Sequence, residues 1–220
     1  MRVVVNAAMS ADGKLSSRRR EQIAISGEAD FDRMDALRAG SDAVMVGVGT
    51  VLADDPHLTL DDTDRQSARR DRDESIHPAR VVADSRARTP TDARILDDAA
   101  TTYLLVSEDA PKERLDALES TGARLITAGD ERVDLAAALP RLEREGVEQL
   151  MVEGGGELIF SLFEAALVDE LRVYVGSKVI GGRDAPTLAD GDGFVSEFPA
   201  LDLEAVERID DGVLLRYAVV

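Results

Sequence analysis

The chain has 220 residues, which is enough for one large domain or two small ones with a substantial core. Its net charge is −18, so nucleic acid and anionic membranes are not expected as partners. The absence of cysteine excludes disulfides, thiolate metal sites and a cysteine nucleophile.

The choice of charged residues is uneven. Lysine occurs only at Lys14, Lys112 and Lys178, while arginine supplies the other basic side chains. Abundant Asp and Glu with so little lysine is typical of proteins from salt-accumulating halophiles, and an ordinary acidic protein is the alternative. The chain runs directly into Val3-Val4-Val5, with no signal-peptide pattern and no apolar stretch long enough to span a membrane, which predicts a cytoplasmic protein.

Strand and helix signals alternate along the chain. Short apolar runs predict buried strands at residues 2–8, 42–46, 80–84, 102–106, 123–127, 150–152 and 170–175. Helical patterns cover residues 26–39, 111–120, 133–145 and 157–166. Ser26 is the expected N-cap of the first helix, and Gly40 is its stop. Pro111 fits the first turn of the second helix, and Pro140 should kink the third or delay its start.

Two segments depart from this alternation. Residues 61–78 are densely charged and almost free of apolar side chains, which predicts a mobile surface loop. Near the C-terminus, residues 203–209 and 213–220 flank Asp210-Asp211-Gly212, a pattern typical of a hairpin. Strands that alternate with helices predict one α/β domain with a mostly parallel sheet, to which the hairpin adds antiparallel edge strands.

Glycines separate the strand at residues 150–152 from the helix that follows it. Gly154, Gly155 and Gly156 form the turn, and the first backbone N–H groups of the helix are left unpaired at the positive end of its dipole. Such a turn binds phosphate readily, because glycine lets a ligand approach the backbone. A tight strand-to-helix turn also needs glycine without any ligand, so the turn alone leaves both interpretations open.

Two further segments follow predicted strands. They are Gly47–Thr50 with Asp54, and Asp84–Arg88. Ligands of open α/β sheets bind beyond the carboxyl ends of the strands. Each segment by itself is explained by a turn or a solvated surface, but together with the glycine turn they favour a dinucleotide that carries an extra phosphate. The usual G-x-G-x-x-G turn after the first strand is absent, which argues against a standard dinucleotide-binding fold.

Several motifs resemble those of one known family. They are Ala8–Lys14, Leu37–Ala43, Val46–Pro56, Arg80–Ser85, Val152–Gly156, Val168–Glu170, Lys178 and Gly181-Gly182. The chain is similar to the archaeal reductases of riboflavin biosynthesis that act on 2,5-diamino-6-ribosylamino-4(3H)-pyrimidinone 5′-phosphate. These reductases are homologous to the C-terminal half of the bacterial deaminase–reductase. The resemblance implies a dihydrofolate reductase-like three-layer α/β fold and a homodimer.

The same resemblance implies NADPH-dependent reduction of a phosphorylated pyrimidine. The ribosylamine of that substrate opens to an imine, and hydride delivered to the former anomeric carbon gives a ribitylamino product. The His-x-Glu and Pro-Cys-x-x-Cys signature of the zinc deaminase is missing, so a reductase alone is expected. The alternatives are a reductase of the same fold that acts on a dihydropterin or another heterocycle, and a non-catalytic NADPH-binding module.

The resemblance also implies roles for individual residues. The expected cofactor contacts are Gly49, Thr50, Asp54, Ser85, Arg86, Gly154, Gly155 and Gly156. Thr50 and Asp54 would lie at the nicotinamide, Ser85 near the adenosine 2′-phosphate, and the glycine turn at the pyrophosphate. Arg86 and Arg88 add guanidinium groups suited to the 2′-phosphate. The expected substrate contacts are Asn6, Arg38, Leu58 and Glu153.

Asp54 and Glu153 are the candidate catalytic residues. Imine formation and protonation need a proton source, and a partly desolvated carboxyl group has a raised pKa that suits this task. A loop acid without any role in proton transfer is the alternative for both residues.

The expected contact for the substrate phosphate departs from the pattern of related proteins. Asp61 follows Leu58-Thr59-Leu60 at a place where related bacterial proteins often have an arginine that contacts the substrate. The substrate phosphate would therefore need another partner, with Arg38, Lys14 and Arg65 as candidates.

No metal site is expected, because His57 and His77 have no ligand pattern around them.

Overall fold

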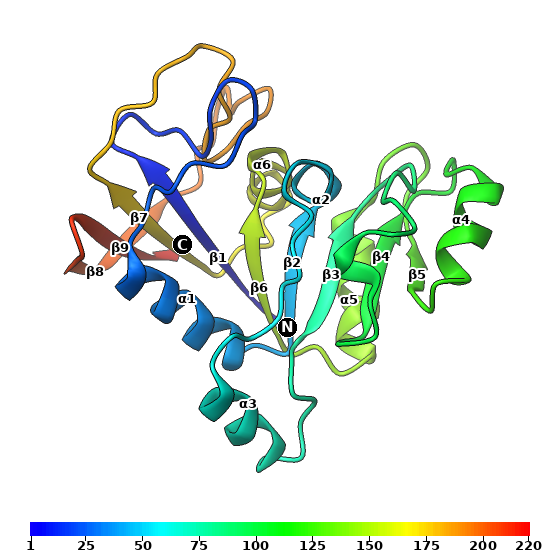
Figure 1. Ribbon diagram of the computed structural model, residues 1–220. Helices are drawn as coiled ribbons and strands as arrows, with labels where there is room; N and C mark the ends of the chain where they lie inside the picture. Colours follow the sequence, from blue (N-terminus) through cyan, green and yellow to red (C-terminus); the bar gives the residue numbers. More distant parts are fainter. The chain divides into compact units, whose positions relative to one another are not determined.

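The computed structural model describes residues 1–220, which form two compact units (Figure 1). The first unit comprises Met1 and Asp35–Met151, and the second comprises Arg2–Met34 and Val152–Val220. The organisation of the chain as one domain stays a prediction. No helix is both long enough and apolar enough to cross a membrane.

A parallel sheet forms the centre of the first unit. Its strands are β2 (Ala43–Gly47), β3 (Ala79–Ala83), β4 (Thr102–Val106), β5 (Arg124–Thr127) and the first residues of β6 (Gln149–Gly154). Their hydrogen-bonded order is β5-β4-β3-β2-β6, and the pairs β2–β3, β3–β4 and β4–β5 are parallel. Every residue of β4 is buried, as expected for a parallel strand that is covered on both faces and reads as a continuous apolar run.

The first unit contains the two helices predicted for it and three others that were not predicted as helices. The predicted helices are α4 (Lys112–Glu119) and α5 (Leu135–Arg144), and the others are α2 (Val48–Asp54), α3 (Thr63–Arg70) and the short 3₁₀ helix η1 (Arg94–Leu96). Pro140 lies inside α5, which begins five residues before it, so the proline does not delay the start of the helix, and the predicted kink stays a prediction. The start is set by Asp134, whose carboxylate accepts a hydrogen bond of 3.0 Å from the N–H of Ala137.

The second unit combines parallel and antiparallel pairing. Its strands are β1 (Arg2–Ser10), the end of β6, β7 (Glu170–Gly176), β8 (Leu201–Ile209) and β9 (Gly212–Val219), in the order β6-β1-β7-β9-β8. β1 and β7 are parallel, whereas β9 is antiparallel to both β7 and β8. The helix α6 (Gly156–Glu164) belongs to this unit, and so does the first part of α1 (Glu28–Ala39). The predicted C-terminal hairpin is confirmed.

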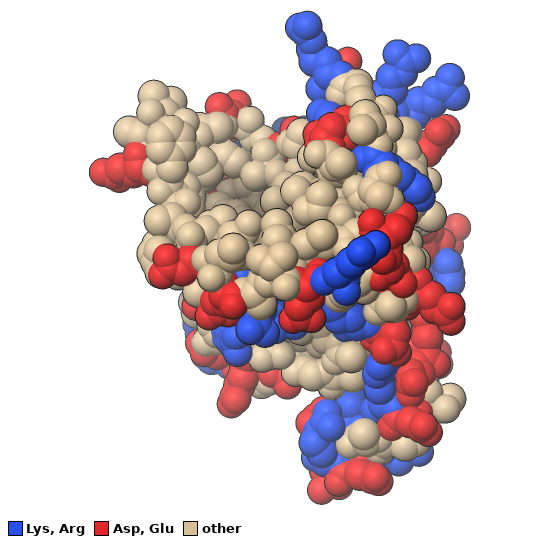
Figure 2. All heavy atoms as spheres, turned by 90° about the vertical axis from the view of Figure 1, so that its left-hand side faces the viewer, with Lys and Arg blue, Asp and Glu red and all other residues tan.

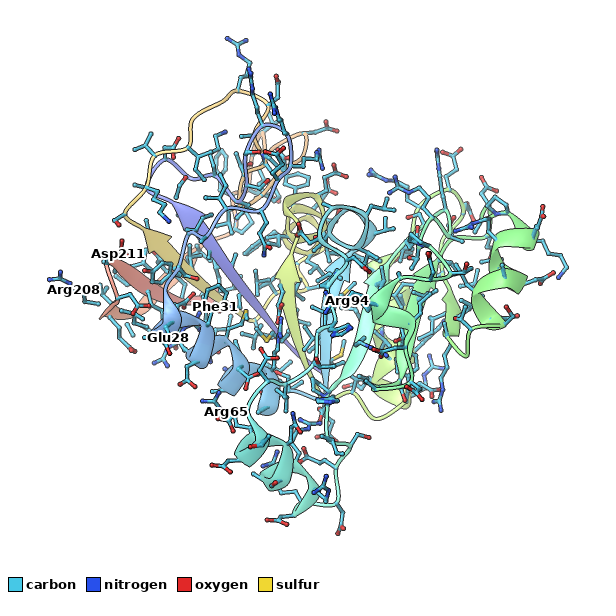
Figure 3. All side chains as sticks on the ribbon, viewed as in Figure 1. Glu28, Phe31, Arg65, Arg94, Arg208 and Asp211 are labelled. Carbon is cyan, nitrogen blue, oxygen red and sulfur yellow. The ribbon has the colours of Figure 1, made fainter.

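Every predicted strand and helix is present, and no end differs by more than two residues. The predicted N-cap Ser26 is wrong, because α1 begins only at Glu28. The cap comes from the β8–β9 turn, where the Asp210 carboxylate accepts the N–H of Asp30 at 3.2 Å. Figure 3 shows Glu28 and Phe31 of α1 beside Asp211 of this turn. A Cβ atom at Gly27 would lie 2.7 Å from the Asp210 carboxylate, so glycine is needed here.

The predicted mobile loop at residues 61–78 is wrong in its first half, which contains α3. Asp62 caps this helix by accepting the N–H groups of Asp64 and Arg65 at 2.8 and 2.9 Å. Arg69 is only 4% exposed although it carries a charge. α3 is therefore held by polar contacts, and an argument from apolar periodicity cannot detect such a helix.

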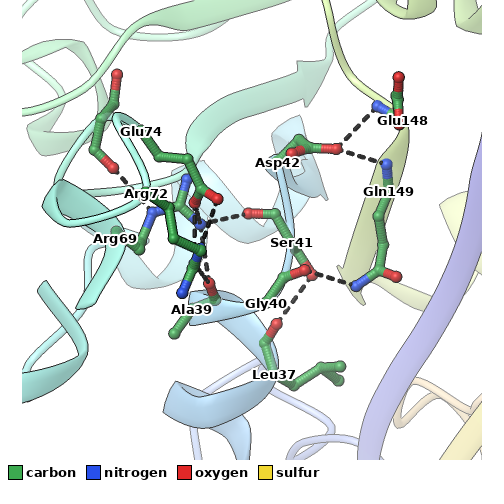
Figure 4. A network of polar contacts seen from close by, with 11 residues as sticks. Leu37, Ala39, Gly40, Ser41, Asp42, Arg69, Arg72, Glu74, Glu148 and Gln149 are labelled. Atoms are coloured by element: carbon green, nitrogen blue, oxygen red, sulfur yellow. Dashed lines mark hydrogen bonds and ion pairs between the residues drawn. The ribbon is translucent and has the colours of Figure 1, made fainter.

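Arg69 binds the C-terminal end of α1 (Figure 4). Its guanidinium donates to the carbonyl oxygens of Ala39 at 2.9 Å and Ser41 at 2.8 Å, and an ion pair of 3.3 Å joins it to Glu74. The last carbonyl groups of a helix lack partners within the helix, and a buried cation satisfies them and the negative end of the dipole. Arg69 thus explains why a charged segment is ordered.

The amino ends of β2 and β6 are tied together beside this network (Figure 4). The Asp42 carboxylate accepts the N–H groups of Glu148 and Gln149 at 2.9 and 2.8 Å. The side-chain amide of Gln149 donates to the carbonyl of Gly40 at 2.8 Å. These bonds fix where the two strands start.

Candidate active site

In the first unit, β2 passes into α2 without any intervening loop. Gly47 is the N-cap of α2 and no side chain caps the helix, so its first N–H groups remain open. Gly49 is exposed, and a Cβ atom there would meet nothing within 4 Å. Thr50, the next residue, is half-buried. The start of α2 therefore offers open space beside backbone donors and a hydroxyl group.

The two aspartates at the end of α2 have different tasks. Asp55 adopts a left-handed conformation, and its carboxylate accepts the backbone N–H of Arg94 at 2.8 Å. The Arg94 guanidinium in turn approaches Nδ1 of His57 at 2.9 Å. Asp54 makes no such structural bond; although this residue is exposed, the protein around its carboxyl group removes part of the water and raises its pKa above the ordinary value. A raised pKa is the direction needed for a carboxyl group that donates a proton.

The loop after β3 is a rigid turn. Asp84 is fully buried, and its carboxylate accepts the backbone N–H and the hydroxyl of Thr89 at 2.7 and 2.8 Å. Arg114 of α4 donates to the carbonyl oxygens of Ala87 at 2.9 Å and Thr89 at 2.7 Å. Arg86 and Arg88, which lie between these anchors, are exposed. The loop thus presents two guanidinium groups from a fixed backbone.

Ser85 links three loops of the first unit. Its hydroxyl oxygen accepts the N–H of Val133 at 3.0 Å, and its carbonyl accepts the hydroxyl of Ser107 at 2.6 Å. The hydroxyl hydrogen of Ser85 is left for a further acceptor. The strand register aligns Gly47 of β2 with Ala83 of β3, so α2 and the loop that carries Ser85 leave the same edge of the sheet.

Two predicted substrate contacts lie close together in the first unit. Arg38, in the last turn of α1, donates to the carbonyl of Thr59 at 3.0 Å. Leu58 is 3% exposed and has φ of 54°, so its side chain lies in the interior. Arg38 therefore contacts the segment that contains Leu58.

The other candidates for the substrate phosphate also have protein partners. Lys14 donates to the carbonyl of Ala185 at 3.2 Å in the second unit. Arg65 forms an ion pair of 3.0 Å with the buried Asp35 in the first unit. A cavity of about 490 Å³ is lined by Arg65 and Arg69 together with the end of α1, and Arg65 is the one predicted candidate for a ligand contact among its lining residues. This cavity adjoins the polar network of Figure 4.

In the second unit, the glycine turn is imposed by two different constraints. Gly154 has φ of 134°, a conformation that other residues rarely adopt. At Gly156, the first residue of α6, a Cβ atom would collide with the carbonyl oxygen of Thr187. No side chain caps α6, whose N-cap is Gly155, so its first N–H groups are open to a ligand. A Cβ atom at Gly154 would meet nothing within 4 Å, so there is room beside the turn.

The segment that contacts Gly156 is held in place by the motif Ala8–Lys14. The Asp12 carboxylate accepts hydrogen bonds from the hydroxyl of Ser10 at 2.6 Å and from the backbone N–H groups of Ile180 and Gly181 at 3.0 and 2.7 Å. These bonds, with the Ser10 hydroxyl as the main cause, lower the pKa of Asp12 to about 2. The motif is thus a structural anchor for residues 180–187.

The remaining predicted contacts lie on strands of the second unit. Glu153 is half-buried on β6, directly before the glycine turn. Asn6, on β1, is 6% exposed, and its side-chain oxygen accepts a hydrogen bond of 2.9 Å from Arg33 of α1. Sequence reasoning missed both Arg33 and Arg114, because a single arginine on a helix carries no motif. No group of three or more His, Asp or Glu side chains that could hold a metal ion is found in the structure.

Comparison with known proteins assigns the chain to a family. The family described as the RibD C-terminal domain matches residues 1–215. The chain belongs to this family. It is 49% identical over 210 residues to the 2,5-diamino-6-ribosylamino-4(3H)-pyrimidinone 5′-phosphate reductase of Archaeoglobus fulgidus, with 96% of the chain and 94% of the relative covered. A protein of the same name from Methanothermobacter thermautotrophicus is 43% identical over 219 residues, with 99% and 97% covered.

Solved structures of other proteins have the same fold. A pyrimidine reductase-like protein from Corynebacterium diphtheriae has a TM-score of 0.88 at 17% identity, covering 100% of this chain and 92% of the other. RibD of Acinetobacter baumannii has a TM-score of 0.78 at 23% identity, covering 100% of this chain and 58% of the other. The predicted dihydrofolate reductase-like α/β fold is confirmed, and the chain is an oxidoreductase of riboflavin biosynthesis.

Proposed function

We propose that the chain reduces 2,5-diamino-6-ribosylamino-4(3H)-pyrimidinone 5′-phosphate to its ribitylamino product with NADPH. The observation that carries the proposal is the 49% identity, over 96% of the chain, to the Archaeoglobus reductase of that name. The cofactor supplies hydride, so the protein has to position the two ligands and manage protons and charge.

Two carboxyl groups are the proposed catalytic residues, one as a proton donor and the other as a negative charge. Asp54, with its raised pKa, holds a proton to a higher pH than an ordinary aspartate. Glu153 stands at the carboxyl end of β6, and as a carboxylate it would stabilise the positive charge of the imine. Ring opening needs an acid and imine formation creates a cation, so the two residues have complementary tasks.

We infer that NADPH is preferred over NADH. Support comes from the rigid loop Asp84–Thr89, which presents Arg86 and Arg88 beside the Ser85 hydroxyl. Arginine carries a fixed charge and donates in a fork that suits phosphate. The uncapped start of α6 with open space beside Gly154 suits the pyrophosphate of the same cofactor.

We infer that the protein is a homodimer and that β8 and β9 form the contact. Leu203 and Val206 of β8 are 55% and 59% exposed, and they pair with Tyr217 and Leu215 of β9. Residues directly opposite each other share a face of the sheet, so these four form one apolar strip. Figure 2, which views the side of β8, shows uncharged residues over much of this surface in a chain of net charge −18. A second copy would cover the strip.

Light scattering after size exclusion tests the dimer. Leu203→Asp should convert a particle of twice the chain mass into a monomer. Val195, which is 95% exposed outside the strip, supplies the control variant Val195→Asp. A monomeric wild-type protein would exclude the dimer.

We also propose a cytoplasmic, halophilic protein without nucleic-acid or membrane partners. The net charge of −18 with three lysines supports these assignments.

The decisive assay for the function mixes the purified protein, NADPH and the ribosylamino pyrimidine phosphate in high salt. The expected result is loss of NADPH together with formation of the ribitylamino product, identified by mass. A dihydropterin that reacts while the pyrimidine does not would contradict the proposed substrate. Tight NADPH binding without turnover of either compound would contradict the catalytic role.

A further inference from the structure

The Asn6 side chain is held by a charged group of α1. Nη2 of Arg33 donates to the side-chain oxygen of Asn6 at 2.9 Å. The same guanidinium binds the Asp30 carboxylate, with Nε at 2.9 Å and Nη2 at 2.7 Å. Asp30 is 5% exposed, and its backbone N–H donates a hydrogen bond to the Asp210 carboxylate. One planar group thus bridges a buried carboxylate and the asparagine.

This bridge fixes which end of the Asn6 amide faces a ligand. A guanidinium has donors only, so the atom of Asn6 that faces Arg33 is the carbonyl oxygen. The NH₂ group of Asn6 must then point away from Arg33 as a pair of donors. Without Arg33, the amide is able to rotate and present either end.

Arg33 also has a feature that stability alone does not explain. Its Nη1 atom is buried and makes no hydrogen bond. A buried donor without a partner costs about 1–3 kcal/mol, and such groups concentrate where function requires a particular arrangement. We attribute this unfavourable contribution to the arrangement of the guanidinium that orients Asn6.

We propose that Arg33 is a positioning residue that locks Asn6 as a hydrogen-bond donor to an oxygen atom of the substrate. The proposal rests on the function given above, in which Asn6 contacts the substrate. The NH₂ end of Asn6 donates to a phosphate oxygen or to the ring carbonyl oxygen, and it offers no acceptor to the amino groups of the same substrate. Arg33 therefore determines which part of the substrate is placed over β1.

Asn6→Asp is the sharpest substitution. It keeps the shape and the acceptor for Arg33, but it replaces the outward NH₂ group with an oxygen. We expect KM for the phosphorylated pyrimidine to rise about 10-fold or more, because a hydrogen bond is replaced by repulsion between oxygens. KM for NADPH and the Tm should stay unchanged. An unchanged KM for the pyrimidine would overturn the proposal.

A double-mutant cycle tests whether Arg33 acts through Asn6. Arg33→Lys keeps a positive charge beside Asp30, but an ammonium group cannot bridge Asp30 and Asn6 in one plane. It should raise KM for the pyrimidine about 3- to 10-fold in the wild-type background and not at all in the Asn6→Ala background. Equal increases in both backgrounds would show that Arg33 acts independently of Asn6.

Arg216 provides the matched control for this cycle. Its Nε atom is also buried and makes no hydrogen bond, and the same atom forms an ion pair of 3.3 Å with the carboxylate of Glu204. It lies on β9 and does not contact Asn6. Arg216→Lys should leave both KM values unchanged, and a matching rise in KM would mean that the Arg33 effect is a general loss of order.

A spectroscopic test separates this inference from the proposed function. Asn6 is the only asparagine in the chain, so ¹⁵N-asparagine labelling gives a single side-chain NH₂ signal. Ribose 5-phosphate and 2,5,6-triaminopyrimidin-4-one are titrated separately. A shift with the first identifies a phosphate oxygen as the acceptor, and a shift with the second identifies the ring carbonyl. No shift with either probe overturns the inference, even in a protein that turns over the substrate.

Discussion

The two regions proposed to bind phosphate groups are built in opposite ways. The loop Asp84–Thr89 presents side chains, and buried polar groups hold its backbone. The turn Gly154–Gly156 offers bare backbone, and the neighbouring Thr187 leaves no room for a Cβ atom at Gly156. The binding properties of a side-chain site change gradually with single substitutions. A backbone site tolerates no added side chain at the position where another segment lies closest to it. The first is therefore expected to tune cofactor choice, and the second to be required for any dinucleotide.

The largest effects are expected at the two carboxyl groups, one beside each region. Glu153→Gln and Asp54→Asn should lower kcat by about 10²- to 10⁴-fold, because general acid–base catalysis contributes that much. NADPH binding by Glu153→Gln should be retained, as measured by fluorescence titration. Full activity of either variant would show that its carboxyl group has no role in proton transfer.

The pH profile sharpens the assignment of Asp54. Partial removal of water raises the pKa of this group, so as a proton donor it stays protonated to a higher pH than an ordinary aspartate. The value of kcat should then fall as pH rises through the raised pKa, and Asp54→Asn should remove this limb. A limb that persists in the variant would belong to another group.

The backbone site is tested by adding one methyl group. Gly156→Ala forces the Thr187 segment away from α6, which should cost about 1–3 kcal/mol of stability. Misplacement of the helix start should lower kcat/KM by about 100-fold for NADPH and NADH alike. Gly40→Ala is the control, since its nearest heavy atom would be 3.7 Å away, an ordinary contact. Equal behaviour of the two variants would mean that the turn is not constrained.

The side-chain site should give a smaller and more selective effect. Arg86→Ala and Arg88→Ala are each expected to raise Kd for NADPH about 10-fold, since a charge-assisted bond contributes about 1.5–3 kcal/mol. Kd for NADH should barely change. Arg144→Ala removes an exposed arginine of α5 and serves as the control. Equal losses for both cofactors would assign the loop a structural role only.

Lowering the salt concentration should have a smaller effect than these substitutions, although salt acts on the whole chain. The Debye length grows from about 3 Å at 1 M salt to about 30 Å at 0.01 M, so the acidic side chains repel one another more strongly at low salt. Differential scanning calorimetry should give a Tm several degrees lower at 0.01 M, equivalent to about 1–2 kcal/mol for a chain of this size. An unchanged or higher Tm at 0.01 M would contradict a halophilic protein.

The sequence predicted the elements whose cohesion is apolar and local. Strands such as β4 are continuous apolar runs, and α6 shows its buried face through Leu158 and Leu162. α3 was not predicted, because the residue that anchors it is a buried arginine, Arg69, and a charged residue in a sequence is expected to be exposed. The start of α1 was misplaced because its cap, Asp210, lies 180 residues away in the chain. Local patterns contain no information about either contact.

The predicted site residues show the same division. Glycine turns and exposed arginines are visible as residue types, so Gly154–Gly156 and Arg86 were named in advance. The groups that hold them are not visible in this way. Arg114 and Arg33 act through contacts with distant backbone and side chains, which only the tertiary structure reveals.

The division of the chain between the two units also sets the order in which they become complete and fold during translation. The second unit contains both ends of the chain, and the N–H of Val3 on β1 bonds to Asp169, 166 residues later. On the ribosome, β1 emerges long before β7, while the residues of the first unit follow one another almost without interruption. Since segments fold as they become complete during translation, β2–β5 form while β1 still lacks both of its neighbours in the sheet, β6 and β7. A nascent chain that ends before residue 149 should therefore protect β2–β5 from proteases and leave β1 open to them.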